Sequence, residues 1–453
     1  MSRNAEFQRQ LWLHFMPSSM LWIVGLCTLL MAVTWVLSGP PLLATVNLAG
    51  MWCATVGYGA MLAASSLHQE LRHNTWDWQR LSALTPWQMS WGKWLGATCP
   101  AWLLGGCFAV ANMLVVPLWN GGTADWRQLG LAVLWGMAVQ VWAINVVLLG
   151  WRSNGAWGWR KAVLLPWLLL ILVPGTVVSS LWQQLVGTQG VMAFWGMPLS
   201  NHAMAALLGL ACLALGLLAL WRQMSQRLDV ATLPWAWPLG LIALALVLAG
   251  LARPSGVASL SWISCTALLG TAYIALHGVH HARTQWLHVH GHATRRQWVG
   301  VLQTLPLWPI SWLLGMLTAG LWSLAHTDPA PDLPFQTGWL LLLVGFQLLR
   351  DALLLTGFAL LEGRLKSPIT AFTLAWLVFN VLLPLLAWGG AGAAGPVLAQ
   401  GLQPLAGYAL ISASSIPGWV FFLLMLVQVA LVAVWVVRVF RRHVAAPVTP
   451  MPD

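Results

Sequence analysis

Six histidines gather in one short stretch of this chain: His277, His280, His281, His288, His290 and His292. His277 and His281 share one face if the segment is helical, and the last three would line one side of an extended strand. Imidazoles at such spacings could bind zinc, copper or nickel. No cysteine or carboxylate lies between positions 277 and 303 to complete a ligand set. The composition favours a polar loop whose charge varies with pH over a metal site.

A second chemical feature is an ion pair within an apolar run. Arg350 and Asp351 interrupt the run 336–361, and Gln347 lies one turn earlier. Ionisable groups at membrane depth are costly, so they are candidates for a functional site. Adjacent residues on a helix point in different directions, so each should meet a partner on another helix or water. A substrate contact, a structural role and an early end of the run at its cytoplasmic edge all stay open.

The third feature is a charged, tryptophan-rich segment between two apolar runs. It begins at Glu70, has Thr75 five positions later, and ends with Leu84-Thr-Pro86. Gly92-Lys93 then opens the next apolar run. Few other polar segments interrupt this chain, so an external source of energy would have few other places to act on it.

The elements that hold these residues are predicted to be membrane-spanning helices. Of the 453 residues, 59% are hydrophobic and only 7% are charged, far below the charge of a soluble domain. Apolar runs of about 20 residues cross a bilayer as helices. The fold is therefore expected to be an all-α polytopic membrane protein with twelve such runs. They are 20–38, 45–66, 95–117, 128–150, 162–184, 203–221, 234–252, 257–279, 306–325, 336–361, 368–389 and 417–437.

Charge placement predicts the orientation of these runs. With the N-terminus inside, 18 of the 21 Lys and Arg residues fall in cytoplasmic segments. Arg127 and Arg253 would lie outside, and Arg350 lies within a run. This is the bias of the positive-inside rule, and it places both termini in the cytoplasm. The net charge of +11 then indicates contact with anionic membrane lipid and excludes a nucleic-acid partner.

The chain also contains a partial internal repeat. A shift of 221 positions places Leu81, Leu84, Trp87, Ser90 and Trp91 on Leu302, Leu305, Trp308, Ser311 and Trp312. Each copy follows the second run of its half and leads into the third. We therefore expect two parallel six-span halves, 1–225 and 226–443, with a boundary near 222–233 and a short cytoplasmic tail, 444–453.

The pattern from Glu70 to Lys93 resembles the cytoplasmic coupling segment of the type-2 ABC exporter permeases. Residues 4–16, with Phe7, Leu11 and Phe15 on one helical face, look like the elbow helix of that family, or extend the first span. The resemblance implies a coupling segment at 68–93 and a coupling-like segment at 280–305, which lacks counterparts of Glu70 and Lys93. The docking residues it implies are Glu70, Arg72, Thr75, Trp76, Trp78, Arg80, Leu81, Leu84, Pro86, Trp298, Leu302 and Leu305. A solvated loop with interfacial tryptophans is the alternative.

The resemblance further implies a permease of a bacterial-type cytoplasmic (inner) membrane, driven by two separate ATPase subunits. The chain has no Gly-x-x-x-x-Gly-Lys-[Ser/Thr] loop, so ATP and Mg would be bound by those partners and the chain itself would not be an enzyme. A hydrophobic or amphipathic cargo would move by alternating access. Two other classes stay open: a twelve-helix secondary transporter, which needs ionisable residues in several spans, and a membrane enzyme modifying lipid or sugar, which needs an acidic outer motif.

Overall fold

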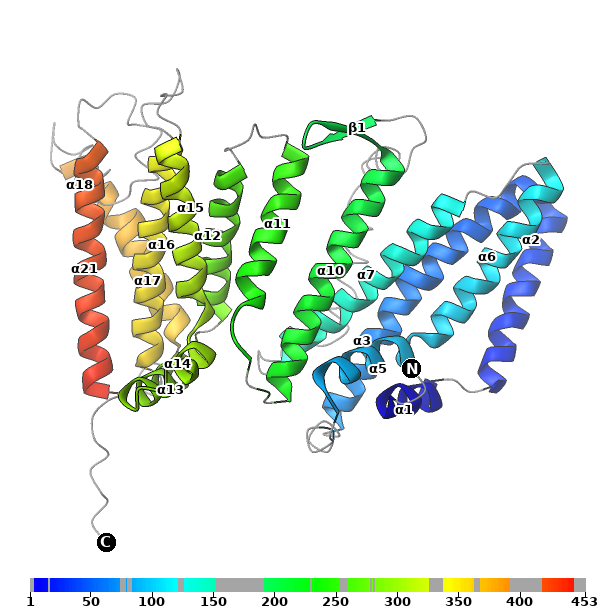
Figure 1. The fold of residues 1–453 in the computed structure, drawn as a ribbon, viewed down its shortest axis with the longest axis horizontal. Coiled ribbons are helices and arrows are strands. Elements are labelled where there is room, and N and C mark those ends of the chain that lie inside the picture. Colours follow the sequence, from blue (N-terminus) through cyan, green and yellow to red (C-terminus); the bar gives the residue numbers. More distant parts are fainter. Residues whose placement is uncertain are drawn as a thin grey trace, which may run out of the picture. The chain divides into compact units, whose positions relative to one another are not determined.

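The computed structural model describes most of the chain as helices in two compact units. Unit 1 is Met1–Thr232 and unit 2 is Leu233–Asp453; the sequence places the boundary near 222–233. The ribbon of each unit is drawn in Figure 1. The described residues are 4–14, 17–73, 79, 84–120, 126–151, 191–228, 230, 232–252, 259–277, 279, 282–325, 337–361, 367–390 and 418–443.

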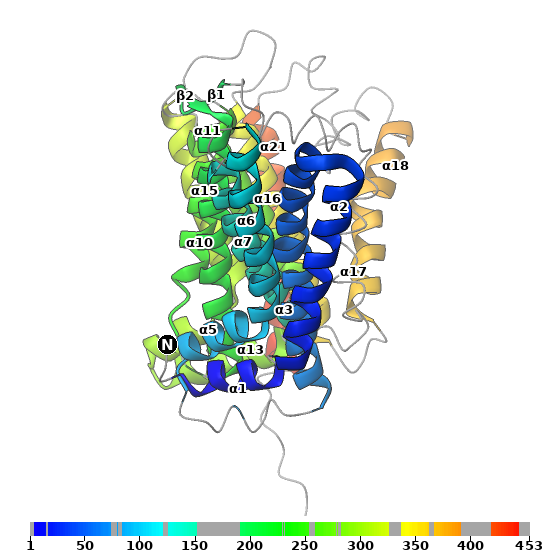
Figure 2. The same cartoon turned by 90° about the vertical axis from the view of Figure 1, so that its right-hand side faces the viewer.

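The described part of unit 1 consists of long apolar helices, two short helices and one hairpin. The long helices are α2 (Pro17–Trp52), α3 (Gly59–Arg72), α6 (Cys99–Asn120), α7 (Trp126–Trp151) and α10 (Asn201–Arg227). The short helices are α1 (Ala5–His14) and α5 (Pro86–Ala97), which lie across the ends of the long ones (Figure 2). A π-helix, η1 (Cys53–Tyr58), joins α2 to α3, and Gly39, with φ 70°, breaks α2 in two.

The hairpin of unit 1 precedes α10. Strands β1 (Val191–Phe194) and β2 (Met197–Ser200) are antiparallel, with Val191 opposite Ser200. Trp195 and Gly196 form the two-residue turn, and both have positive φ, as the turns favoured in hairpins require. The Ser200 hydroxyl then accepts a hydrogen bond from the Ala203 N–H and caps the first turn of α10.

The core of unit 1 lies where α3, α5, α7 and α10 meet. Leu67, Met89, Ile144 and Met224, one from each of these helices, are at most 1% exposed and pack in a single cluster. A second cluster joins α2, α6 and α7 through Met51, Phe108 and Ala132. The short helix α5 is therefore part of the packed body of unit 1, although it does not span the membrane alone.

Among its described residues, unit 2 has six long helical segments and two short helices. The long segments are α11 (Ala236–Ala252), α12 (Ser259–His277), α15 (Leu307–Ala325), α16 (Thr337–Leu360), α17 (Pro368–Leu377) with η4 (Val378–Leu382) and α18 (Leu383–Gly390), and α21 (Gly418–His443). The short helices α13 (Ala282–Thr294) and α14 (Trp298–Thr304) lie at one end of the long ones (Figure 1). Helix α12 packs on α15, and α16 packs on α21.

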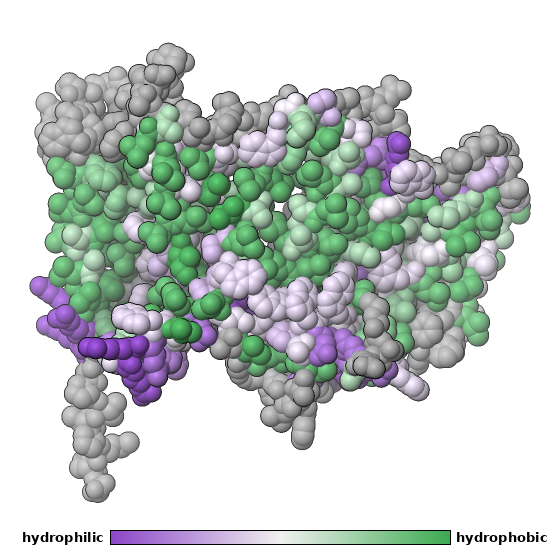
Figure 3. Space-filling view, viewed as in Figure 1, coloured by the Kyte–Doolittle hydropathy of each residue, from purple (hydrophilic) through white to green (hydrophobic). Residues whose placement is uncertain are grey.

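Eight helices in the described part of the chain are long and apolar enough to cross a membrane, or nine if the bent pair α5–α6 counts as one span. On the face drawn in Figure 3, hydrophobic residues cover most of the described surface above a hydrophilic lower edge. The chain is therefore an all-α, multi-pass membrane protein. Run 162–184 lies outside the described residues, and the other predicted runs fall on helices that the structure describes. The total of twelve spans stays a prediction.

The two copies of the repeated motif begin helices at equivalent positions and then differ. Pro86 starts α5 and Leu307, 221 positions later, starts α15. In each copy a serine hydroxyl donates to the carbonyl of this first residue: Ser90 over 2.8 Å and Ser311 over 3.2 Å. Helix α5 ends at Ala97 and bends by 51° into α6, whereas α15 runs on to Ala325 as one helix. The six-plus-six duplication stays a prediction.

Candidate functional site

The predicted coupling segment leads into a short helix with a well-defined start. The Thr85 hydroxyl accepts a hydrogen bond from the Gln88 N–H over 3.3 Å, and the Gln88 side chain accepts one from the Thr85 N–H over 3.0 Å. This reciprocal pair is a capping box, and Pro86 at the first helical position has the φ that a helix needs. The sequence Thr-Pro-Trp-Gln thus fixes where α5 begins.

Helix α1 lies directly on α5. The Asn4 side chain caps α1 by accepting from the Glu6 N–H over 3.0 Å, and its amide donates to the Gln88 carbonyl over 2.7 Å. The close approach depends on two glycines of α5. A Cβ at Gly92 would lie 2.8 Å from the Glu6 Cβ, and one at Gly96 would lie 2.5 Å from the Gln10 Cβ. Only glycine fits at these two positions without a shift of α1.

Four charged side chains and one amide meet where α1, α3 and α5 converge. Lys93 of α5 is 1% exposed and pairs with Glu70 of α3 and, over 3.1 Å, with Glu6 of α1. Arg9 pairs with Glu6 over 2.8 Å and with Glu70. The Gln10 amide donates to both carboxylates. We call Glu6, Arg9, Gln10, Glu70 and Lys93 the charge cluster; it joins α1 to α3 and α5, which lie much later in the sequence.

The charge cluster is electrically balanced, with two carboxylates and two cations. Burial alone would raise the pKa of Glu6, but its hydrogen bonds with Arg9 and Gln10 and the charge of Lys93 outweigh burial and lower that pKa. Burial lowers the pKa of His14, at the end of α1, and the charge of Glu70 opposes this only in part. The loss of any one partner in such a cluster leaves a buried charge uncompensated.

A line of hydrogen bonds runs from α5 into the membrane-spanning helices of unit 1. The indole N–H of Trp94, the neighbour of Lys93, donates to the Gln140 side chain of α7 over 3.0 Å. The Gln140 amide then donates to the backbone carbonyl of Thr55 over 2.7 Å. Thr55 lies in the π-helix η1, whose wider turns leave backbone groups accessible to such partners. A displacement of α5 would therefore act on the second span through this line.

The structure places four of the nine docking residues predicted in the first segment. Glu70 is 8% exposed and belongs to the charge cluster, so its carboxylate acts inside the protein. Arg72 is exposed at the end of α3, and Pro86 begins α5. Leu84 is half-buried against the core of unit 1. The other five lie outside the described residues: Thr75, Trp76, Trp78, Arg80 and Leu81.

The predicted second segment, 280–305, contains helices α13 and α14. Its three predicted docking residues are all described. Trp298 is 67% exposed and Leu302 47%, and the neighbouring Val299 is 62% exposed. Leu305 is half-buried and follows the last residue of α14. Helix α14 thus presents a short apolar face with no side chain of its own buried.

The expectation that the last three histidines line an extended strand is wrong. His288, His290 and His292 lie on the helix α13, where alternate residues point to different sides. His290 packs its ring edge-on against Phe440, 5.5 Å between centroids, and His292 Nδ1 lies 2.9 Å from the Gln297 side-chain oxygen. No group of three metal-ligating side chains occurs among the described residues. The side chains of His277 and His281 lie outside them.

Arg350 and Asp351 form a polar centre inside unit 2, with Gln347 beside it. The Arg350 guanidinium is 1% exposed and pairs with Asp351 over 2.8 Å. It also donates to the Asn380 side chain of η4 and to Gln428 of α21, each over 2.6 Å. Gln347 donates to the same Asn380 oxygen over 3.2 Å. The pair lies within α16, which continues to Leu360, and whether it marks the cytoplasmic edge of the span stays open.

Sequence reasoning missed several members of these sites. Glu6 and Gln10 of the charge cluster were not selected, and neither were Gln140, Asn380 and Gln428. Two features of the sequence could have indicated the charge cluster. Glu6 and Gln10 are four apart on a short helix, and Gly92-x-x-x-Gly96 surrounds Lys93. A small-xxx-small stripe allows close helix contact, and a lysine within it needs an acidic partner on the helix that docks there.

No family model, curated protein or solved structure matches this chain. The resemblance of residues 68–93 to a permease coupling segment therefore remains a prediction from those residues. In chemical terms, the charge cluster pairs its two carboxylates with its two cations. It ties the short helix α5 to α1 and α3.

Proposed function

We propose that this chain is the transmembrane permease of an ATP-binding cassette exporter, with ATP and Mg bound by two separate ATPase subunits. The proposal rests on the way in which α5 is held against its neighbouring helices. This short helix follows residues 74–83 in the sequence, is tied to α1 and α3 by the charge cluster, and bends by 51° into α6. A partner that pushes on residues 74–83 would move α5 together with α1 and α3.

The inward hydrogen bonds extend this argument to the spans. Trp94 is 1% exposed and Gln140 is fully buried, so the bonds from α5 to η1 lie in a low-dielectric interior where they are strong. A π-helix is a local widening that can change its pairing at modest cost, and such segments are frequent at functional sites. We propose that movement of α5 changes the pairing at Thr55 and tilts the second span, opening a path for a hydrophobic or amphipathic cargo.

The second segment supports a second, weaker contact with the ATPase pair. Helix α14 exposes Trp298, Val299 and Leu302 on one turn of helix, an apolar face suited to a protein groove. It has no counterpart of Lys93, because that position is Leu314, inside the span α15. We therefore propose that α14 docks without being tied to its spans by buried charge, and that the first segment transmits most of the force.

Paired tryptophan substitutions test this proposal. Trp76→Ala with Trp78→Ala should weaken binding of the ATPase subunits by about 30- to 1000-fold, the range expected for tryptophans at an interface centre. Trp298→Ala should weaken it less. The matched control is Trp126→Ala, an exposed tryptophan on the other end of unit 1. Equal losses from both segments would contradict the asymmetry, and no loss from either would remove the docking assignment.

A secondary transporter is the second candidate, favoured by the polar centre of unit 2. A carboxylate paired with a buried arginine in a span can carry a proton or cation in transport. Under this alternative, Asp351→Asn should abolish transport driven by a proton gradient in vesicles without ATP. Gradient-driven transport by the chain alone would favour this class over the permease.

A further inference from the structure

Helix α21 has two faces of different character. Its inner face packs on α16 through Met425, which is fully buried, Gln428, which binds Arg350, and Trp435, whose ring lies 5.3 Å from that of Phe358. Its outer face carries Val427, Leu431 and Val434, which are 56%, 67% and 49% exposed. Only 11% of the most apolar stretch of α21 is buried within the protein. In a membrane this outer face contacts acyl chains.

The same outer face ends in arginines. Residues 427, 431, 434, 438 and 441 follow one another at alternating steps of four and three, so they form one stripe along the helix. Arg438 and Arg441 therefore continue the apolar stripe, and Arg442 lies beside Arg438 at a spacing of four. All three are exposed. The stripe passes from acyl-chain depth to headgroup depth within one helix.

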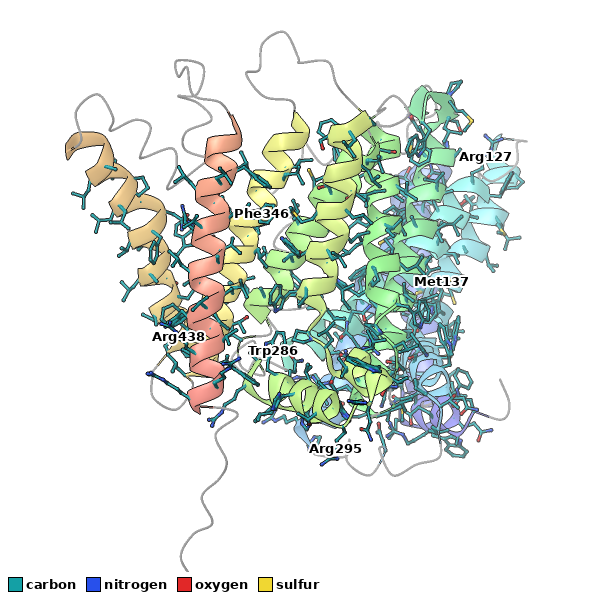
Figure 4. All side chains as sticks on the ribbon, turned by 60° about the vertical axis from the view of Figure 1, so that its left-hand side comes forward. Arg127, Met137, Trp286, Arg295, Phe346 and Arg438 are labelled. Carbon is teal, nitrogen blue, oxygen red and sulfur yellow. The ribbon has the colours of Figure 1, made fainter. Side chains whose placement is uncertain are left out.

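Helix α13 adds to this basic end. The contact between His290 and Phe440 places α13 beside the last turns of α21. Its end carries the exposed pair Arg295 and Arg296 (Figure 4, where Arg295 and Arg438 are labelled at the same end of unit 2). Figure 3 shows hydrophilic residues gathered there. Among the described residues of unit 2 the one carboxylate is Asp351, which pairs with Arg350. No described acid therefore offsets these cations.

We propose that the end of α21, together with α13, binds the phosphate headgroups of anionic phospholipids. A guanidinium matches two phosphate oxygens with two parallel N–H donors, so arginine suits this ligand better than lysine does. A lipid fits better than a soluble anion, because the arginines continue a face that contacts acyl chains. It also fits better than an acidic protein for the same reason. This inference is independent of the proposed function.

Native mass spectrometry of the purified full chain tests the proposal, with phosphatidylglycerol and phosphatidylcholine as probes. The chain should bind phosphatidylglycerol more tightly. Changing Arg438, Arg441 and Arg442 together to Gln should weaken that binding by at least about tenfold, since each arginine near a membrane surface contributes about 1 kcal/mol. Binding of phosphatidylcholine should not change. Lysine at the same three positions keeps the charge and should restore only part of the affinity, and it also controls for folding.

Arg127→Gln serves as the matched control for a single charge, because Arg127 is exposed at the other end of a span. It should leave phosphatidylglycerol binding unchanged, whereas Arg438→Gln should weaken it. Equal affinity of the unaltered chain for the two lipids would overturn the proposal. So would full retention of the preference in the triple Gln variant. Displacement of the lipid by inorganic phosphate or by a soluble acidic peptide at comparable concentration would show a soluble-anion or protein site instead.

Discussion

At the scale of single residues, the charge cluster shows why a buried ionisable group in this chain needs partners of opposite charge. Lys93 and Glu70 are nearly fully buried, and each compensates the charge of the other while Glu6 and Arg9 do the same. The desolvation cost of such groups is offset only when all members are present. The cluster is therefore expected to respond to substitution as a unit and not as separate pairs.

Single and double substitutions test whether the charge cluster responds as a unit. Glu70→Gln or Lys93→Met alone leaves one uncompensated buried charge and should destabilise the protein by about 3–5 kcal/mol. The double variant leaves Glu6 and Arg9, whose opposite charges balance. Its loss in free energy of unfolding should therefore be smaller than the sum of the two single losses. Thermal unfolding of the detergent-solubilised chain measures this, with the exposed Arg72→Gln as control. Additive losses would contradict the coupling.

The pH dependence of stability follows from the two shifted groups of α1. The pKa of Glu6 is lower in the folded protein, so its stabilising contribution is present at neutral pH and is lost as pH falls through that lowered pKa. The pKa of His14 is also lower, so protonation of the unfolded chain destabilises the fold once pH falls below about 6.5. Unfolding midpoints should fall between pH 7.5 and 5, and His14→Gln should flatten that fall. An unchanged slope in His14→Gln would contradict the account of His14.

The residue-level interpretation from sequence was partial for a physical reason. Charges are rare in an apolar chain, so Glu70, Arg350 and Asp351 were evident as candidates. Their partners were not, because the sequence does not show that Glu6 meets Lys93 or that Gln428 meets Arg350. Amides such as Gln140 and Asn380 are less costly to bury than charges and so leave a weaker signal.

At the scale of elements, the position of α5 depends on the close packing of α1 against it. Helix α1 buries Glu6 and Gln10 against α5. The reason is the glycine pair of α5, which lets polar side chains of α1 reach Lys93. Meanwhile Trp12 and Leu13 of α1 stay exposed, as suits a helix at a membrane surface.

Alanine substitutions of glycine test this close packing. Gly96→Ala places a Cβ 2.5 Å from the Gln10 Cβ and should destabilise the protein by about 1–3 kcal/mol through overpacking. Gly106→Ala is the matched control, because nothing lies within 4 Å of its added Cβ. That variant should be neutral or stabilise by about 0.5–1 kcal/mol, as alanine favours a helix. The two unfolding midpoints decide between these outcomes, and equal effects would contradict the close contact of α1 with α5.

Hydropathy predicted the long helices well and their irregularities poorly. Runs of apolar residues identify spans because the bilayer imposes helix on them. The π-helices η1 and η4 depend instead on side chains from other helices, Gln140 and Arg350, that bind within or beside them. The difference between α5–α6 and α15 also escaped prediction, because the five shared residues fix a helix start and not its length.

At the scale of the whole molecule, the orientation in the membrane can be measured directly. In a cysteine-free background, a cysteine at position 290 should react only with reagent supplied from the cytoplasmic side, because α13 carries the basic residues predicted to lie inside. A cysteine at position 120, the last residue of α6, should react from outside. External labelling at position 290 would reverse the orientation and remove the basis for docking by α13 and α14.

The measurement that tests the central claim most directly is ATP hydrolysis by the purified chain, alone and in complex with ATP-binding subunits that co-purify with it. Our account predicts no hydrolysis by the chain alone and hydrolysis by the complex, with transport lost when Trp76 and Trp78 are both changed to Ala. Hydrolysis by the isolated chain, or transport that continues without any ATP-binding subunit, would contradict it.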